Sequence, residues 1–405
     1  MSRVRWRSRI TASVRMGVPR VILLLQRLWP VRAWAVVRGY PAMEGNAVEV
    51  VRALTRRYRG RVAWIDGPPI DVINALGIPA DKVQSVPPMR SWRAVRAYLT
   101  AEVVFFTHGL YGEPPPGPHR VTVNVWHGEP IKGGVLFPQR RAPGPSSTYL
   151  VGSSVLLADR KLSLAGLGAG AHLLVGNPRT DGLFRPASDD VLASLGIDAA
   201  RPYVMWMPTF RVADTGKTSW SDTVDPDLAA DVTGQFRACA IRLRARGLQV
   251  VVRPHPLDAH PRGADADIVV LDEDLKRTGV TLYQVLGRAA GLISDVSSVW
   301  VDYLMIDRPM AFFMPDASAM ANGRDIFPLA DLGGFPGTEL RDSAASEYFA
   351  DDVFSGGELT RALRTEVRDR LGLVQSRTVS DDLIDMLHAR GALRRGGVMP
   401  RGERP

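Results

Sequence analysis

Short apolar runs that stop abruptly at glycine, proline or polar residues alternate with helical stretches along most of this chain. A strand buried on both faces has such a continuous apolar sequence, and parallel strands require a crossover, usually a helix, between them. The alternation therefore predicts an α/β fold with parallel sheets. In the first half of the chain the apolar runs are RVAWID, EVVFFTHG, VTVNVWHG, TYLVGSS and HLLVGNP, and the helical stretches include AVEVVRALTRRY and WRAVRAYLTA.

The same rhythm restarts after a segment that is typical of a domain boundary. Residues 185–202 contain two prolines and a short helix for which Ser188 is the expected cap. A chain of 405 residues is long enough for two domains of roughly 100–200 residues each. We predict two Rossmann-like domains, over residues 39–186 and 187–390, that face a cleft. The later apolar runs are YVMWMPTF, LQVVVRPHP, DIVVLDE, GLISDVSS and PMAFFMPD.

The net charge of +9 is concentrated at the N-terminus. Residues 1–40 contain nine arginines and no acidic residue, and removing these nine from the 51 basic residues leaves 42, equal to the number of acids. The remainder of the chain is formally neutral, which excludes a general nucleic-acid-coating surface. The single cysteine, Cys239, excludes a disulfide framework and a thiolate metal cluster.

The two ends of the chain have unusual compositions. Residues 1–38 are predicted to be a basic amphipathic segment on a membrane surface, because arginine interleaved with tryptophan, leucine and valine suits anionic lipid. The apolar run at residues 21–25 is too short for a spanning helix, and no signal-peptide cleavage site follows it. A core-packing helix with a solvated basic face and an RNA-binding arm are the alternatives. The glycine-, proline- and arginine-rich tail, residues 391–405, is predicted to be disordered.

Polar residues cluster where the predicted strands end, and open α/β sheets bind ligands at that edge. His127 follows the run VTVNVW, and histidine is the side chain whose ordinary pKa lies closest to neutrality, so it is a candidate general base. Lys132, five residues later, is a candidate phosphate contact. A histidine that only hydrogen-bonds the turn is the alternative, and His108, after the run VVFFT, is a reserve candidate.

Two polar turns lie on either side of the expected boundary. The turn after HLLVG offers polar contacts to a substrate, with helix capping by its aspartate as the alternative. The turn after YVMWM places a hydroxyl beside a guanidinium, which suits a phosphate, with an ordinary solvated turn as the alternative. The candidate substrate-binding residues in these turns are Asn177, Arg179, Asp181, Pro208, Thr209 and Arg211.

Two more clusters end later strands. Arg253 and His255 leave the run LQVVV together in a loop stiffened by prolines, which suits a pyrophosphate, and a rigid connection without a ligand is the alternative. Asp295, Ser297 and Ser298 stand between a strand and a helix, where hydroxyl and free N–H groups can bind an anion. A plain N-cap by Asp295 or Ser297 is the alternative.

Several familiar signatures are absent from the sequence. It contains no P-loop, GxGxxG, HExxH or GxSxG pattern. No acidic metal cage is evident either, so we predict no metal-binding residues and no cofactor, and a divalent-metal requirement stays open.

Taken in order, these clusters resemble the CDP-glycerol:poly(glycerophosphate) glycerophosphotransferase family of teichoic-acid primases and polymerases. The resemblance covers roughly residues 39–340, beginning at GYPAMEGNA. The matching segments are Trp126-His127-Gly128-Glu129-Pro130-Ile131-Lys132, Gly176-Asn177-Pro178-Arg179-Thr180-Asp181, Pro208-Thr209-Phe210-Arg211, Arg253-Pro254-His255-Pro256, and Asp295-Val296-Ser297-Ser298 followed by Asp302, Arg308 and Pro309.

This resemblance implies a GT-B architecture and transfer of an alditol phosphate from a CDP-alditol, with CMP leaving. It implies that His127 is the general base and that His255 stabilises the pyrophosphate. The residues implied to hold the nucleotide phosphates are Thr209, Arg211, Arg253, Ser297 and Ser298. Phosphoryl transfer depends mainly on positioning and charge neutralisation, and this set supplies both.

The sequence departs from the family pattern at two places. The family's Asp-Tyr-Ser-Ser is Asp-Val-Ser-Ser here, and Gly323-Arg324 replaces a tyrosine followed by Arg-Gly. These positions, Arg324 included, are expected near the alditol or the acceptor, so CDP-glycerol and CDP-ribitol both stay open as donors. Asp302, which matches the family pattern, is a further candidate substrate-binding residue.

The implied partners are a lipid-linked acceptor and an anionic membrane surface, with the enzyme peripheral on the cytoplasmic face and no nucleic acid bound. Two other functions stay open. One is a GT-B nucleotide-sugar glycosyltransferase of capsule or glycolipid synthesis, for which Glu339 is a weak candidate ribose contact. The other is a non-catalytic nucleotide-binding scaffold, which the presence of both His127 and His255 disfavours.

Overall fold

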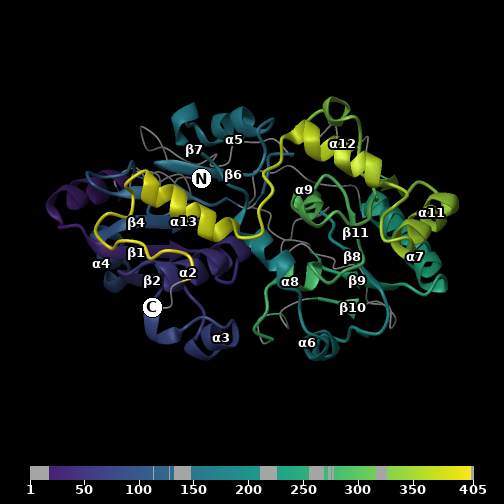
Figure 1. Cartoon of the computed structure of the whole chain (residues 1–405), viewed down its shortest axis with the longest axis horizontal. Coiled ribbons are helices and arrows are strands. Elements are labelled where there is room, and N and C mark those ends of the chain that lie inside the picture. Colours follow the sequence, from purple (N-terminus) through teal and green to yellow (C-terminus); the bar gives the residue numbers. More distant parts are fainter. Residues whose placement is uncertain are drawn as a thin grey trace, which may run out of the picture. The chain divides into compact units, whose positions relative to one another are not determined.

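The computed structural model describes residues 18–112, 114–126, 128–131, 147–209, 226–254, 269–271, 275, 278–315 and 326–402. The chain forms two compact units, each built on one parallel sheet (Figure 1). The first unit comprises Met1–His127, Val135–Asp181 and Ser376–Pro405, and the second comprises Gly128–Gly134 and Gly182–Gln375. Two parallel sheets with helical crossovers confirm the predicted α/β class.

The first unit contains a seven-stranded sheet in the order β3-β2-β1-β4-β5-β6-β7. The chain runs outward from the central strand β1 to β3 and then returns to the other side of β1 with β4, so the order reverses between β1 and β4. The strands are β1 (Arg32–Arg38), β2 (Arg61–Ile65), β3 (Val83–Val86), β4 (Ala101–Phe106), β5 (Val121–Asn124), β6 (Tyr149–Gly152) and β7 (His172–Leu174). The α-helices are α2 (Gly45–Arg57), α3 (Ile70–Ala75), α4 (Trp92–Thr100), α5 (Ala158–Ala165) and α13 (Val379–Ala389).

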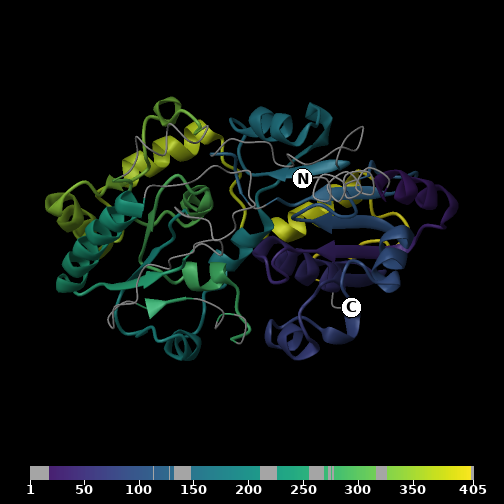
Figure 2. The ribbon, with the colours of Figure 1, turned by 180° about the vertical axis from the view of Figure 1, so that it is seen from behind.

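Both faces of the first sheet are covered, because alternate residues of its central strands enter different cores. Ala35 and Val37 pack with α2 and α13 on one face, whereas Val36 packs with α4 and with Ile22 of a helix over residues 18–28 on the other. Helix α13 crosses in front of β1 and β4 in Figure 1 and behind them in the reverse view of Figure 2.

The second unit repeats this topology with six strands in the order β10-β9-β8-β11-β12-β13, so its order reverses between β8 and β11. Trp206 of β8 stacks on Phe236 at a centroid distance of 3.7 Å within the core of this unit. The strands are β8 (Tyr203–Trp206), β9 (Gln249–Val252), β10 (Val269–Val270), β11 (Gly291–Ser294), β12 (Met310–Phe312) and β13 (Thr338–Glu339). The α-helices are α6 (Asp189–Ser194), α7 (Pro226–Ala245), α8 (Leu282–Leu286), α9 (Val299–Tyr303), α11 (Ser343–Phe354) and α12 (Arg361–Leu371), and Ser188 caps α6 as expected.

The predicted boundary of the N-terminal segment at residue 38 is wrong. Residues Arg32–Arg38 form the central strand β1, which pairs with β2 on one side and β4 on the other. The apolar run AWAVV suits a strand that is covered on both faces of the sheet. Arginines border this run at both ends, and for that reason it was not recognised as a strand within the basic N-terminal segment. Among the helices of the described residues, none has the length and apolar content that crossing a membrane requires.

The expectation for the C-terminal end is also wrong. Residues 376–390 belong to the first unit and not the second, and the tail is folded on that unit as far as residue 402. Ala392 and Leu393 are buried in its core, and Glu102 accepts hydrogen bonds from the backbone N–H groups of Arg395 and Gly396, both at 2.8 Å. The glycines that suggested disorder serve tight turns, such as Gly397 with φ of 69°.

The folded tail gives a direct stability test. Replacing Leu393 by alanine is expected to lower the free energy of unfolding by about 2–3 kcal/mol, because the side chain is fully buried and its loss leaves a cavity. Urea unfolding measures the change, with Arg394→Ala, an exposed neighbour, as the control. A Leu393→Ala protein as stable as the wild type would mean that the tail is detached in solution.

Candidate functional site

The strongest candidate site lies at the carboxyl edge of the second sheet, between β8 and β11. In open α/β sheets, ligands bind where the strand order reverses, outside the carboxyl ends of the strands. Ile293 of β11 pairs with Trp206 of β8, so the turns that follow these two strands emerge side by side. These turns carry the predicted residues Pro208, Thr209, Asp295, Ser297 and Ser298.

Asp295 joins the two turns. Its Oδ2 accepts a hydrogen bond from the backbone N–H of Thr209 at 2.8 Å, and its Oδ1 accepts one from the Thr209 hydroxyl at 2.7 Å. The same Oδ1 accepts the backbone N–H of Ser297 at 2.9 Å. We call these three residues the Asp295 clamp. Both Asp295 and Thr209 are 1% exposed, so the clamp positions the turns from below the surface.

Two serine side chains beside the Asp295 clamp remain accessible to solvent. Ser297 and Ser298 are half-buried, and Ser298 is the N-cap residue of α9 without a side-chain capping bond. The Ser298 hydroxyl is therefore not spent on closing the helix, and it can contact an anionic group.

Three other residues of the matching motifs make structural contacts within the second unit. Arg253 donates from Nη1 to the carbonyl of Leu271 at 2.6 Å, and its backbone N–H bonds the Trp206 carbonyl at 2.9 Å. Asp302 is buried and accepts the Tyr283 hydroxyl at 2.6 Å. Arg308, in the matching Arg-Pro pair, bonds the carbonyls of Gly287 and Ala289. These contacts fix the loops that surround β8 and β11.

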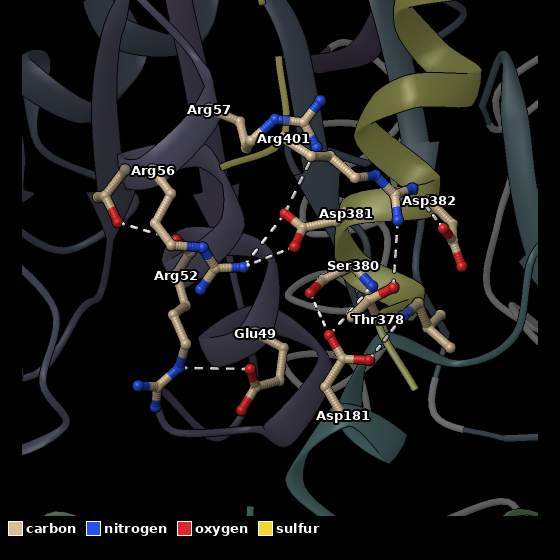
Figure 3. A network of polar contacts seen from close by, with 12 residues as sticks. Glu49, Arg52, Arg56, Arg57, Asp181, Thr378, Ser380, Asp381, Asp382 and Arg401 are labelled. Atoms are coloured by element: carbon tan, nitrogen blue, oxygen red, sulfur yellow. Dashed lines mark hydrogen bonds and ion pairs between the residues drawn. The ribbon is translucent and has the colours of Figure 1, made fainter. Parts of the chain in front are cut away.

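The turn Asn177–Asp181 lies in the first unit, at the end of β7. The backbone N–H of Arg179 donates to Asn46 Oδ1 at 2.9 Å, and the Asn177 carbonyl accepts the backbone N–H of Thr180 at 3.0 Å. Asp181 accepts the backbone N–H of Val379 at 2.6 Å and that of Ser380 at 3.1 Å, and also bonds the Ser380 hydroxyl (Figure 3). Asp181 therefore satisfies the first backbone N–H groups of α13, whose N-cap residue is Thr378.

Burial raises the pKa of Asp181 to about 6, and the nearby Glu49 carboxylate adds to the rise, against hydrogen bonds from Ser380 and Val379 that lower it. The folded protein consequently binds more protons than the unfolded chain between the ordinary pKa of 3.8 and about 6. In this window the contribution of Asp181 to the free energy of unfolding falls as the pH rises.

Asp181→Asn is expected to remove that pH dependence. As the pH rises from 4 to 6, the free energy of unfolding of the wild type should fall by up to about 1.4 kcal/mol per pH unit relative to that of the variant. Because the amide also places an N–H₂ group against the donors of α13, the variant should be less stable at every pH in this range. Urea unfolding at several pH values measures both. Parallel stability curves for the two proteins would contradict the raised pKa.

Five predicted residues lie outside the described residues, namely His127, Lys132, Arg211, His255 and Arg324. Their roles stay predictions. Within the described part of the chain, no group of three histidine, cysteine or acidic side chains is arranged to hold a metal ion.

The sequence did not point to Asn46 and Ser380 as the partners of the turn after β7. Asn46 is 133 residues from Arg179, and Ser380 is 199 residues from Asp181. Contacts over such separations leave no local pattern, and only the GYPAMEGNA segment carried any signal for Asn46.

Comparison with known proteins finds a matching family. The profile of a family described as CDP-glycerol:poly(glycerophosphate) glycerophosphotransferase matches residues 78–345. A teichoic acid ribitol-phosphate primase from Bacillus spizizenii is 27% identical over 160 residues, which cover 38% of this chain and 38% of that protein. The alignment thus spans well under half of the primase.

Solved structures share the fold. A structure of the wall teichoic acid polymerase TagF, described as a variant with CDPG, has a TM-score of 0.66 at 15% identity and covers 96% of both chains. Another TagF structure has a TM-score of 0.62 at 16% identity, covering 89% of this chain and 90% of that one. A putative UDP-N-acetylglucosamine 2-epimerase from Listeria monocytogenes has a TM-score of 0.53 at 11% identity, covering 91% of this chain and all of the other.

Proposed function

This chain belongs to the CDP-glycerol:poly(glycerophosphate) glycerophosphotransferase family, and we propose that it transfers an alditol phosphate from a CDP-alditol to a hydroxyl of a lipid-linked cell-wall or capsule acceptor. Glycerol phosphate is the favoured group, with ribitol phosphate as the other donor to test. CMP is the second product.

The Asp295 clamp is the observation that carries this proposal. It brings the Pro208-Thr209 turn and the Asp295-Val296-Ser297-Ser298 turn together at the point where the strand order of the second sheet reverses. Both turns match family motifs, and this edge is where an open α/β sheet binds a nucleotide. Ser297 and Ser298 are proposed to face the donor phosphates, with Arg253 and Arg211 adding positive charge. Thr209, whose N–H and hydroxyl both bond Asp295, holds the turn beneath them and does not contact the phosphates itself.

The reaction requires an in-line displacement at phosphorus. The acceptor hydroxyl attacks the β-phosphorus, its proton passes to His127, and the bond from that phosphorus to the bridging oxygen breaks, so that CMP leaves with this oxygen. His255 and the arginines are proposed to neutralise charge on the pyrophosphate as the bond breaks. The clamp keeps the surrounding turns in place before the substrate arrives.

We also propose that the enzyme acts at the cytoplasmic face of a membrane. Val21, Leu24 and Leu28 on the helix over residues 18–28 are exposed, and exposed arginines flank them. An apolar stripe beside basic residues suits an anionic lipid surface. Co-sedimentation with vesicles containing phosphatidylglycerol, but not with pure phosphatidylcholine, is the expected result, and Leu24→Glu should weaken it.

A donor panel tests the proposed reaction. The purified protein is incubated with a lipid-linked acceptor and CDP-glycerol, CDP-ribitol or a UDP-sugar, and the released nucleotide is measured. Release of CMP from one CDP-alditol is expected. Release of UDP alone would assign the chain to nucleotide-sugar transfer, and release of neither from a folded protein would support a non-catalytic scaffold.

A further inference from the structure

The carboxyl edge of the first sheet carries a row of three aromatic rings that no part of the proposed donor site uses. Arg38, Phe106 and Asn124 are paired across the neighbouring strands β1, β4 and β5. Two residues beyond each of them along the chain stand Tyr40, His108 and Trp126, in the same relation to three adjacent parallel strands. We call these three residues the aromatic row.

The three rings form a continuous series. The Tyr40 and His108 rings lie 5.5 Å apart at an interplanar angle of 74°, and the His108 and Trp126 rings lie 5.4 Å apart at 43°. Tyr40 and His108 flank the β1/β4 position at which the strand order of this sheet reverses. This is the place in the first unit where an open α/β sheet binds a ligand.

Backbone contacts hold the row in position. The N–H of Tyr40 donates to the Thr107 hydroxyl at 3.0 Å, and the N–H of Trp126 donates to Asn124 Oδ1 at 3.0 Å. The Arg38 guanidinium contacts the carbonyl of His108 at 3.4 Å and pairs with Asp66 at 3.1 Å. The Trp126 ring also packs on the cluster that contains Leu150 and Leu162. A row fixed in this way is preorganised for binding.

The row is an uncharged surface with polar tips. Burial, with a smaller effect of the Arg38 charge, lowers the pKa of His108 to about 4, so the ring is neutral at physiological pH. Tyr40 is 62% exposed, whereas His108 and Trp126 are half-buried. Neutral aromatic faces attract the positively polarised C–H groups of a ring. These rings carry no net positive charge that would attract a phosphate. The C–H face of a sugar ring, in contrast, can pack on a neutral aromatic face.

We propose that the aromatic row of Tyr40, His108 and Trp126 is the subsite for a sugar ring of the acceptor. This inference rests on the proposed function, because only the transfer reaction provides an acceptor. It assigns Tyr40 as the exposed platform and His108 as a neutral positioning residue between Tyr40 and Trp126. Trp126 immediately precedes His127 in the sequence, so a sugar held on the row is bound beside the segment proposed to activate its hydroxyl.

The test compares Tyr40→Leu, which removes the ring, with Tyr40→Phe, which keeps it. The acceptor KM is expected to rise about three- to tenfold in Tyr40→Leu and to stay within about twofold of wild type in Tyr40→Phe. The KM for the CDP-alditol should be unchanged in both. His108→Leu should likewise raise the acceptor KM, and its effect should not depend on pH between 6 and 8.

The outcomes separate this inference from the proposed function. Saturation-transfer NMR with diacetylchitobiose as a sugar probe, carried out on the whole chain, should detect binding in wild type and Tyr40→Phe and a loss in Tyr40→Leu. Sugar binding without CMP release would refute the proposed reaction but not the subsite. CMP release with an acceptor KM unchanged in Tyr40→Leu would overturn the subsite, and a rise in the donor KM instead would assign the row to the nucleotide base.

Discussion

CMP release from a CDP-alditol is expected to fall by about 100- to 10,000-fold when His127 is replaced by alanine, the range by which general bases accelerate reactions. His127 directly follows Trp126, whose backbone is fixed by Asn124 and whose ring packs in the first unit. In the proposed reaction the acceptor hydroxyl is a poor nucleophile until its proton is removed. The assay measures CMP release under saturating donor and acceptor.

His388→Ala is the matched control, since His388 is exposed near the end of α13 and plays no part in the proposed reaction. It should leave the rate within about twofold of wild type, as expected for a surface substitution. Donor binding should persist in His127→Ala, because the donor contacts are proposed in the second unit. A His127→Ala enzyme with wild-type turnover would remove His127 from the mechanism.

Asp295→Asn is expected to lower kcat/KM for the CDP-alditol about 100-fold and the free energy of unfolding by about 2–4 kcal/mol. The carboxylate accepts from Thr209 at both of its oxygens and from Ser297 at one. An asparagine offers one acceptor oxygen and turns an N–H₂ group toward a donor in a fully buried place. The two turns should then separate, with loss of the phosphate contacts.

Asp342→Asn provides the same chemical change at an exposed position. Asp342 caps α11 by accepting from the Ala345 N–H at 2.8 Å, and asparagine caps helices equally well. Isothermal titration with CDP-glycerol below the unfolding midpoint of each variant separates binding from stability. Asp295→Asn protein with wild-type affinity and stability would contradict a role for the clamp.

Most strands were predictable because a doubly covered parallel sheet demands continuous apolar runs. The runs VVFF of β4 and VVV of β9 are buried along their length, as their composition required. β1 was missed because arginines border it and a basic, tryptophan-containing segment precedes it. The folded tail was missed because a composition rich in glycine, proline and arginine indicates disorder only when the segment has no folded partner. Here the tail packs on the hydrophobic core of the first unit and bonds Glu102.

The segments of the donor site were predictable, but their connections were not. Thr209 and Asp295 each belong to a recognisable motif, whereas the bonds between them span 86 residues and depend on the neighbouring placement of β8 and β11. Asp181 also belongs to a recognisable motif. Its carboxylate accepts a backbone N–H at the start of α13, 198 residues later in the chain, and this role could not be read from the motif. The motifs identified these residues as candidates, and the fold determines which hydrogen bonds each of them makes.

Transfer of labelled glycerol phosphate is the most direct test of the proposed reaction. CDP-glycerol carrying ¹⁴C in the glycerol is incubated with the protein and a lipid-linked acceptor, and the lipid-phase label and the CMP are quantified together. We predict label in the lipid phase in equal amount to the CMP released, and both reduced by at least about 100-fold in His127→Ala. CMP formed while all label stays water-soluble as glycerol phosphate would show a hydrolase and contradict the proposed transfer.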